Sequence, residues 1–358
     1  MDGLGAAQAA DSLGAHAAPL RILLISDAWF PQVNGVVRTL SIVVDHLRAG
    51  GDTVEVIGPD RFTNIPMPGY AEIRLAIAPR RKLMQLADAF QPDAVHIATE
   101  GPLGWAMRGI CRKRGWPFTT AFHTRFPEYL HARTSIPLSW SWAMMRRFHE
   151  AGAGTFAATQ SLREELGRRG FTKIRAWTRG VDLQRFRPEP REPWEGLERP
   201  IFLYAGRVAV EKNIEAFLSL DLPGTKVVVG EGPAREGLMR RFPKAHFTGY
   251  RDNGVLARSY AGADVFVFPS RTDTFGLVLL EALASGTPVA AFPVTGPRDV
   301  ITDPRVGALD EDLRAACMTA LDGDRAACRS HAEGWSWDAC AAQFRAALVP
   351  VPGRALAV

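Results

Sequence analysis

Residues 269–288, PSRTDTFGLVLLEALASGTP, form the most informative segment of this chain. The pattern predicts a strand end, a loop and an apolar helix that stops at Gly-Thr-Pro. We expect Asp273 and Thr274 to cap the helix start, where free amides and the helix dipole suit an anion such as a diphosphate. Glu281 follows Asp273 by eight residues, which places the two carboxylates about 12 Å apart along a helical axis. An amphipathic core helix with a capped start would carry the same pattern.

Apolar runs and helical patterns alternate on both sides of this segment. Residues 21–26 are typical of a buried strand, residues 36–47 of a helix, and residues 52–58 of the next strand. The same alternation predicts a helix at 104–113 and strands at 93–97, 118–122, 201–204, 226–229, 245–248, 264–268 and 288–292. Such alternation indicates an α/β fold in which helices cover parallel sheets.

The stretch RFRPEPREPWEGLERP, residues 185–200, has four prolines, many charges and no periodicity, and it predicts a linker. We therefore expect two doubly wound, Rossmann-like lobes joined by a hinge. The predicted units are a disordered leader (1–19), an N-terminal lobe (20–188), a linker (189–199), a C-terminal lobe (200–334), a final helix (335–348) and a tail (349–358).

Composition restricts the class of protein. A chain of 358 residues with 47% hydrophobic and 23% charged residues can bury two sizeable cores. The four cysteines form no C-x-x-C pair, which favours a reducing cytosol and no structural metal. The first nineteen residues lack the apolar run of a signal peptide, and no stretch of eighteen uncharged apolar residues predicts a membrane span.

The net charge of +5 is unevenly distributed. Residues 21–189 carry 24 Lys and Arg against 15 Asp and Glu, a net +9, so the rest of the chain stands at −4. A basic first half suits an anionic partner such as a phosphorylated substrate or a membrane surface, although solvated surface charge gives the same count. No ordered basic and aromatic groove indicates nucleic-acid binding.

The segment that contains Asp273 and Glu281 resembles the acidic-x7-Glu element of the retaining, two-lobed (GT-B) glycosyltransferases of family 4. The resemblance extends over residues 20–348, and its motifs occur in the same order in both lobes. It implies a GT-B fold with an interlobe cleft and a C-terminal helix that crosses back to the first lobe. Asp273 replaces the usual first Glu, so a shorter side chain would contact the donor sugar, and Glu281 would bind the ribose.

Other second-lobe residues match the donor site of this family. Arg207 and Lys212 match a Gly-Arg…Lys element whose two cations stabilise the diphosphate as the glycosidic bond breaks. The implied donor-binding residues are Gly206, Gly230, Gly232, Tyr250, Arg251, Thr274, Phe275, Gly276 and Leu277. Tyr250 and Arg251 belong to the segment beside the nucleobase, where main-chain contacts do not identify the base.

First-lobe motifs resemble the acceptor side. His123, in the sequence Phe-His-Thr, resembles a histidine that contacts the donor sugar near the reacting carbon. The resemblance implies acceptor contacts from Asn34 and Glu128 and a backbone approach to the ligand at Gly35. Two departures stand out: Asn34-Gly35 replaces a pair of glycines, and Val294-Thr295-Gly296-Pro297 replaces a Gly-Gly pair.

No metal or other cofactor is expected. Asp322-Gly323-Asp324 is predicted to be a solvated turn, and Arg207, Lys212 and the helix start supply the positive charge that a Mg²⁺ ion would otherwise bring. The resemblance, not the spacing, implies retention of anomeric configuration. In that account the acceptor hydroxyl gives its proton to the leaving phosphate, and no residue is assigned as general base.

The expected function is a retaining α-glycosyltransferase that moves a hexose from a nucleotide diphosphate sugar to a hydroxyl of a lipid or glycan. Within the family, PQVNGV at 31–36 and TDTFG at 272–276 resemble bacterial GDP-mannose-dependent α-mannosyltransferases, and UDP-sugar-using sulfoquinovosyl-diacylglycerol synthases are similar. Two other classes stay open. One is a nucleotide-sugar 2-epimerase of the same fold, which could enlist Asp27, Glu100 and Glu128, and the other is a silent nucleotide-sugar sensor.

A membrane partner is suggested by two segments of the first half. Residues 138–147 combine tryptophans and methionines with two adjacent arginines, and the helix predicted at 104–113 brings Arg108, Arg112 and Lys113. This profile is typical of a segment that lies on anionic lipid, and equally of a core helix. We expect a cytoplasmic enzyme, peripheral on the inner face of the membrane.

Overall fold

The computed structural model describes residues 18–32, 34–67, 70–77, 79–131, 136–190 and 194–353. The predicted disordered leader, as far as residue 17, and the predicted tail from residue 354 lie outside the described residues.

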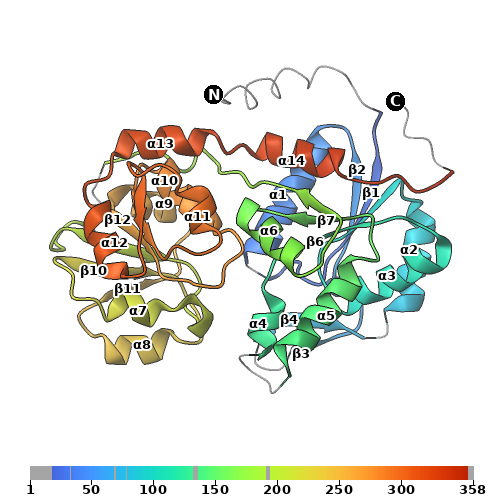
Figure 1. Ribbon diagram of the computed structural model, residues 1–358, viewed down its shortest axis with the longest axis horizontal. Helices are drawn as coiled ribbons and strands as arrows, with labels where there is room; N and C mark the ends of the chain where they lie inside the picture. Colours follow the sequence, from blue (N-terminus) through green and yellow to red (C-terminus); the bar gives the residue numbers. More distant parts are fainter. Residues whose placement is uncertain are drawn as a thin grey trace.

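Six parallel strands form the sheet of the first lobe, in the order β2-β1-β5-β6-β7-β8 (Figure 1). Central strand β1 is apolar because both of its faces are covered, and its Ile22 pairs with Val54 of β2 on one side and Ala94 of β5 on the other. The strands are β1 (Arg21–Ile25), β2 (Thr53–Ile57), β5 (Ala94–Ile97), β6 (Thr119–Ala121), β7 (Gly154–Ala157) and β8 (Ile174–Ala176).

The second lobe repeats this architecture with a parallel sheet in the order β11-β10-β9-β12-β13-β14. Its strands are β9 (Ile201–Ala205), β10 (Thr225–Val229), β11 (His246–Gly249), β12 (Val265–Phe268), β13 (Val289–Ala291) and β14 (Gly307–Leu309). The two doubly wound sheets confirm the predicted fold. An antiparallel pair, β3 (Asn64–Met67) and β4 (Tyr70–Ala76), was not predicted, nor were β7, β8 and β14.

Helices cover both faces of each sheet (Figure 1). In the first lobe, α1 (Gly35–Ala49) packs on one face, and α2 (Arg80–Phe90) and α3 (Pro102–Arg114) pack on the other. The remaining helices are α4 (Phe126–His131), α5 (Leu138–His149), α6 (Gln160–Arg168), α7 (Ile214–Leu218), α8 (Arg235–Arg241), α9 (Asn253–Gly262), α10 (Leu277–Ala284), α11 (Pro297–Val300), α12 (Leu313–Ala320), α13 (Arg325–Glu333) and α14 (Trp337–Ala346), with short 3₁₀ turns η1 (Pro59–Arg61) and η3 (Val210–Lys212).

The final helix, α14, crosses back to the first lobe as predicted. Its Phe344 is fully buried and packs on Phe156 and Trp177 of that lobe. The indole Nε1 of Trp177 donates to the carbonyl of Cys340 at 3.2 Å. The chain therefore passes between the two lobes twice, once at the linker and once at α14.

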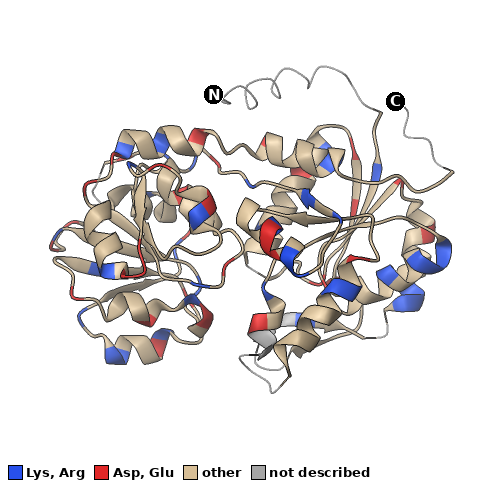
Figure 2. Ribbon diagram, viewed as in Figure 1, with Lys and Arg blue, Asp and Glu red and all other residues tan. Residues whose placement is uncertain are grey.

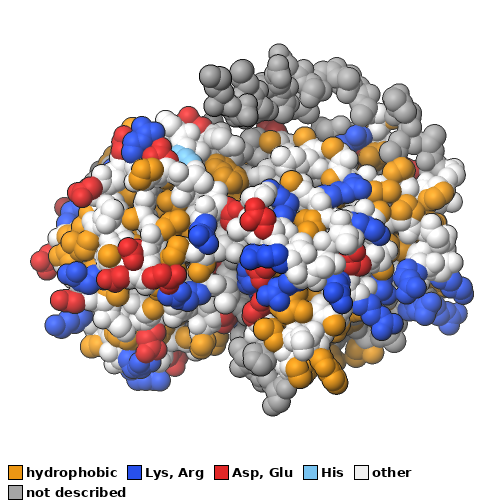
Figure 3. All heavy atoms as spheres, viewed as in Figure 1, with side chains coloured by type: hydrophobic (Ala, Val, Ile, Leu, Met, Phe, Trp, Pro, Cys, Tyr) orange, Lys and Arg blue, Asp and Glu red, His pale blue; other side chains and the backbone are white. Residues whose placement is uncertain are grey.

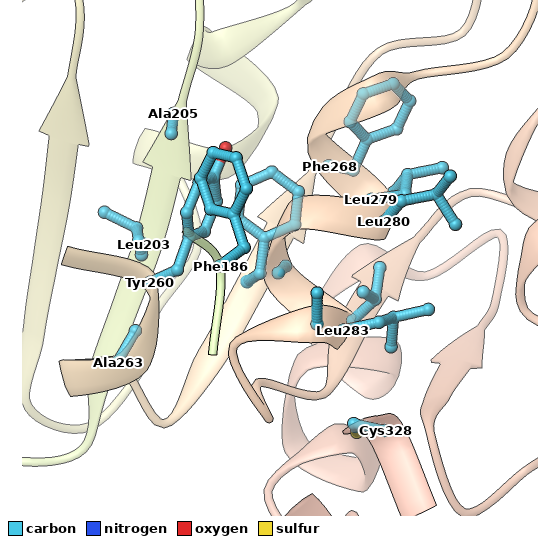
Figure 4. Close-up of a cluster of buried hydrophobic side chains, with 14 of the residues drawn as sticks. Phe186, Leu203, Ala205, Tyr260, Ala263, Phe268, Leu279, Leu280, Leu283 and Cys328 are labelled. Carbon is cyan, nitrogen blue, oxygen red and sulfur yellow. The ribbon is translucent and has the colours of Figure 1, made fainter. Parts of the chain in front are cut away.

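The connection between the lobes is anchored in the second-lobe core. Phe186 is fully buried there against Tyr260, with ring centroids 5.9 Å apart (Figure 4). Trp194 also packs in this core, and its Nε1 donates to the carbonyl of Ser259 at 3.1 Å. Phe186 was assigned to the first lobe (20–188) and Trp194 to the linker (189–199), yet both side chains pack in the second-lobe core.

Candidate functional site

The carboxyl edges of the two sheets face each other across the lobe interface. Three first-lobe segments that follow β1, β6 and β7 contact second-lobe segments that follow β12 and β13. The contacts join Arg38 to Glu281, Thr274 to the carbonyl of His123 at 2.6 Å, and Ser161 to Asp299 at 2.8 Å. Open α/β sheets bind ligands at this edge, so the interface is where a site is expected.

The helix predicted from residues 269–288 begins later than expected. Helix α10 starts at Leu277, its N-cap is Gly276 with a φ of +87°, and no side chain caps it. The prediction that Asp273 and Thr274 cap the helix was therefore wrong, and the 12 Å separation that assumed a helical Asp273 does not apply. Asp273 pairs instead with an ammonium, a stronger partner than the amides of a helix start. The first amides of α10 are thus left without a side-chain cap.

Asp273 and Lys212 form the central ion pair of the site. The Nζ atom of Lys212, at the end of η3, lies 2.5 Å from Oδ1 of Asp273. The other carboxylate oxygen of Asp273 is buried without a hydrogen-bond partner in the structure. A buried acceptor of this kind suits a ligand hydroxyl.

Tyr204 supports the loop that carries Arg207. Its hydroxyl donates to the carbonyl of Arg207 at 2.7 Å. Burial raises the pKa of Tyr204 well above its ordinary value, and the charges of Asp273 and Glu211 raise it further, so the phenol stays protonated and donates. The sequence offered no signal for this role, because Tyr204 looks like an ordinary strand residue.

The glycines after β9 and β10 bring two loops into direct contact. A Cβ atom on Gly230 would lie 1.9 Å from the carbonyl oxygen of Gly206, and one on Gly232 would lie 2.3 Å from that of Val208. The loops interlock further because the amide of Val208 donates to the carbonyl of Glu231 at 2.8 Å. Side chains at these glycines would separate the loops, so glycine is required here on steric grounds.

Glu281, the predicted ribose contact, is only 2% exposed. Its Oε1 atom pairs with Arg38 from the first lobe, and its Oε2 accepts from the Tyr260 hydroxyl at 3.0 Å. The Arg38 guanidinium also lies over the ring of Phe186, 5.6 Å from its centroid. Sequence reasoning missed Arg38 and Tyr260, because no local pattern links positions this far apart in the chain.

The remaining predicted donor residues differ in how far their side chains are buried. Phe275 is buried against Trp335, and Leu277 packs at the edge of both lobe cores. Tyr250 and Arg251 follow β11 and are exposed, Tyr250 at 69%. The nucleobase contact assigned to this segment stays a prediction.

His123 lies at the first-lobe side of the interface. Its ring is 5.5 Å from that of Trp177, and its Nε2 atom is buried without a partner in the structure. Burial lowers the pKa of His123 well below its ordinary value, and the charge of Arg179 lowers it further. The imidazole is therefore neutral and has one nitrogen available for a ligand.

The predicted acceptor residues are engaged within the first lobe. The Asn34 side-chain oxygen caps α1 by accepting from the amides of Val36 and Val37 at 3.0 Å each. Gly35 is the first residue of α1, and a Cβ there would meet nothing within 4 Å, so space is open beside it. Glu128 lies 3.4 Å from Arg125 through Oε1, while its Oε2 is buried without a partner.

The last features of the site region concern metal binding and membrane spans. Within the described ranges, no three His, Cys, Asp or Glu side chains are grouped so that they could hold a metal ion. Asp324 of the predicted solvated turn caps α13 with its carboxylate. None of the helices in the described part of the chain combines the length and apolar character that crossing a bilayer requires.

Comparison with known proteins agrees with this arrangement. Residues 33–185 match the Glycosyltransferase Family 4 domain, and residues 199–321 match the Glycosyl transferases group 1 domain. The chain is 33% identical to a GDP-mannose-dependent alpha-mannosyltransferase of Mycobacterium tuberculosis, over 81% of this chain and 83% of that protein. It is 30% identical to the sulfoquinovosyl transferase SQD2 of Arabidopsis thaliana, over 81% of this chain and 62% of that protein.

Solved structures share the fold. Sucrose-phosphate synthase from Thermosynechococcus elongatus superposes with a TM-score of 0.70 at 22% identity, covering 91% of this chain and 97% of that one. Anabaena HepE in complex with UDP superposes with a TM-score of 0.69 at 15% identity, covering 91% and 98%. At these identities the likeness concerns the fold alone.

Proposed function

Because this chain belongs to glycosyltransferase family 4 and is a hexosyltransferase, we propose that it is a retaining α-glycosyltransferase that uses a nucleotide diphosphate sugar, with mannose as the first candidate sugar. The acceptor is a hydroxyl of a lipid or glycan. Two relatives support this choice, the GDP-mannose-dependent alpha-mannosyltransferase and an alpha-monoglucosyldiacylglycerol synthase of Streptococcus pneumoniae. A UDP-sugar-using glycolipid synthase is the nearest alternative.

One observation carries the proposal: Lys212 and Asp273 meet beside the uncapped start of α10, opposite His123. We place the donor diphosphate at the α10 amides and the cations of Lys212 and Arg207, where the negative charge that develops on the leaving group is stabilised. The sugar then lies between the unpartnered oxygen of Asp273 and Nε2 of His123.

The site residues suggest how transfer proceeds. Lys212 faces the leaving phosphate and holds Asp273 in position through their ion pair. A neutral His123 orients a sugar hydroxyl near the reacting carbon. In the proposed retaining reaction the acceptor hydroxyl attacks from the side on which the diphosphate departs, and its proton goes to that phosphate. The reaction as proposed requires no metal ion and no other cofactor.

A thermal-shift screen tests the donor. We expect the ligands of one nucleobase to stabilise the folded chain, either GDP and GDP-mannose or UDP, UDP-glucose and UDP-sulfoquinovose. The free energy of unfolding should rise by about 2.7 kcal/mol when the ligand is in hundredfold excess over its dissociation constant. The double variant Arg207→Ala/Lys212→Ala serves as the control and should lose this shift. No stabilisation of the folded chain by any of these ligands would contradict the diphosphate site.

Two other functions are separated from glycosyl transfer by their products when the same nucleotide-sugars are incubated with and without acceptor. A 2-epimerase returns a changed nucleotide-sugar and releases no free nucleotide diphosphate, whereas a transferase releases it only with acceptor. A silent sensor binds donor without turnover, and His123→Ala would then change affinity alone. Product analysis by chromatography separates the three functions.

We further propose that the first lobe associates with an anionic membrane surface through α5. Trp140 is 73% exposed and Met144 lies on the same exposed face, followed by exposed Arg146 and Arg147. Figure 2 shows Lys and Arg gathered on α2, α3 and α5, and Figure 3 shows hydrophobic side chains beside them. Apolar side chains next to cations suit an anionic lipid interface.

Two residues of the expected membrane segments are structural instead. Trp142 is buried and stacks on Phe122, with ring centroids 5.7 Å apart. Arg108 is also buried, and its guanidinium donates to the carbonyls of Arg147 at 2.7 Å and Phe148 at 3.2 Å, at the end of α5. Their inclusion in the lipid-facing set was wrong, because Trp142 lies on the inward face of α5 and Arg108 on the inward face of α3.

The membrane proposal predicts that Trp140→Ala with Arg146→Glu and Arg147→Glu weakens binding to vesicles of phosphatidylglycerol and phosphatidylcholine. Removing each cation should cost roughly 1 kcal/mol, or about fivefold in affinity. Vesicle sedimentation measures the effect, and Met239→Ala, an exposed hydrophobic residue of the second lobe, is the matched control. Equal sedimentation of the triple variant and the parent chain would contradict the proposal.

A further inference from the structure

Hydrogen bonds within the first lobe hold the carboxylate of Glu100, a residue that has no role yet in the proposed transfer. Nε2 of His149 lies 3.1 Å from Oε1 of Glu100, and Nδ1 of His149 lies 2.8 Å from Oγ1 of Thr120. The His149 side chain is fully buried, whereas that of Glu100 is 14% exposed. The histidine therefore holds Glu100 from the protein side and leaves part of the carboxylate accessible.

Glu100 lies at the carboxyl edge of the sheet. It follows β5, and β5 lies between β1 and β6 in the sheet order. The segments after those two neighbours carry Arg38 and His123, both of which contact the second lobe. The segment that carries Glu100 thus ends between two segments that border the lobe interface, on the side assigned to the acceptor.

A second carboxyl group, that of Asp27, lies close enough to Glu100 to feel its charge. Asp27 is buried and accepts from the amides of Leu103 at 2.8 Å and Gly104 at 3.2 Å, at the start of α3. Burial raises the pKa of Asp27 to about 6, and the charge of Glu100 adds to this. A Cβ on Gly101 would lie 2.3 Å from Asp27, so the backbone next to Glu100 fits tightly against this group.

The charge of this edge limits what can bind there. The negative charges of Glu100 and Asp27 would repel an anionic group of the substrate. A substrate hydroxyl, in contrast, can donate a hydrogen bond to a carboxylate. Arg125, the cation on the segment after β6, cannot offset them fully because it already bonds Glu165 and Glu128.

We propose that Glu100 binds a hydroxyl of the acceptor, with His149 as its positioning residue, and that the acceptor group at this point is an uncharged polyol rather than a phosphate. This inference rests on the proposed function and names the acceptor class for it. Glu100 takes no proton in the transfer, because the proton of the reacting hydroxyl leaves with the phosphate. It orients the headgroup so that the reacting hydroxyl faces the donor carbon.

The test compares Glu100→Gln with the parent chain, using GDP-mannose and UDP-glucose as donors. The uncharged acceptor probes are monooctanoylglycerol and octyl α-mannoside, each with at least two free hydroxyls, and the anionic ones are dioctanoyl phosphatidylinositol and phosphatidylglycerol. We expect transfer to an uncharged probe, with kcat/KM for the acceptor lowered at least tenfold in Glu100→Gln. The donor-induced thermal shift should not change. Glu164→Gln, on an exposed face of α6, is the control that keeps full activity.

His149→Gln tests the positioning role. Its amide can still donate to Glu100, so it should retain more acceptor kcat/KM than His149→Phe, at an equal donor shift. Preference for the anionic probes, or an unchanged acceptor kcat/KM in Glu100→Gln, would overturn the inference while leaving the transferase intact. Donor binding without transfer to any probe would count against the proposed function itself, and the inference would fall with it.

Discussion

Replacing Lys212 by alanine is expected to lower the rate of sugar transfer by about 10²–10³-fold, with the fold intact. Lys212 lies 2.5 Å from Asp273, so one substitution removes the positive charge that we propose faces the leaving diphosphate and also releases the carboxylate that we propose faces the sugar. A preorganised charge inside a closed cleft stabilises the transition state more than the ground state, because the leaving group gains negative charge as the bond breaks. The loss should therefore appear mainly in kcat.

The control is Lys244→Ala, which removes a lysine from the exposed surface of the same lobe. Release of free nucleotide diphosphate in the presence of acceptor measures transfer, and thermal unfolding reports the fold. The Lys212 and Asp273 side chains are only 25% and 17% exposed, so Lys212→Ala should lower the unfolding midpoint, and transfer is compared at a temperature at which both variants are folded. Transfer by Lys212→Ala at the rate of Lys244→Ala would show that Asp273 and the α10 start work without this cation. The diphosphate would then have to lie elsewhere.

The sequence predicted the sheets well because parallel strands covered on both faces are apolar throughout. β1, β9 and β12 are fully or almost fully buried, and each was visible as a short apolar run. The missed strands have a weaker signal. β8 is three residues long and mostly not buried, and β3 contains Pro66, a residue that argues against a strand.

The sequence named candidate site residues but could not predict their partners. The family resemblance pointed to Asp273, Lys212 and Glu281, yet it could not show that Asp273 pairs with Lys212 instead of capping α10. Nor could it show that Glu281 pairs with Arg38, which lies 243 positions away. Such pairs depend on how the two lobes pack, and neither helical nor strand periodicity contains that information. On the acceptor side, the sequence likewise did not show that the Asn34 side chain caps α1, and its acceptor contact stays a prediction.

Replacing Gly230 by alanine is expected to destabilise the second lobe by about 3 kcal/mol or more and to abolish donor binding. The new Cβ would lie 1.9 Å from the carbonyl oxygen of Gly206, and Gly230 has a φ of +138°, which side chains rarely adopt. The backbone would have to move away from Gly206. Because that movement separates the loops after β9 and β10, Arg207 would be displaced along with the loop that carries it.

Gly237→Ala makes the same chemical change seven residues later, with the opposite expected sign. Gly237 lies within α8, and a Cβ there meets nothing within 4 Å. Alanine should therefore stabilise the helix by about 0.5–1 kcal/mol. Urea unfolding followed by tryptophan fluorescence compares the variants, with Trp194 reporting on the second-lobe core. The contrary result is that Gly230→Ala unfolds at the same urea concentration as the parent chain and keeps the donor-induced thermal shift. The close contact of the two loops would then matter neither to stability nor to donor binding, and the steric explanation for the glycine would be wrong.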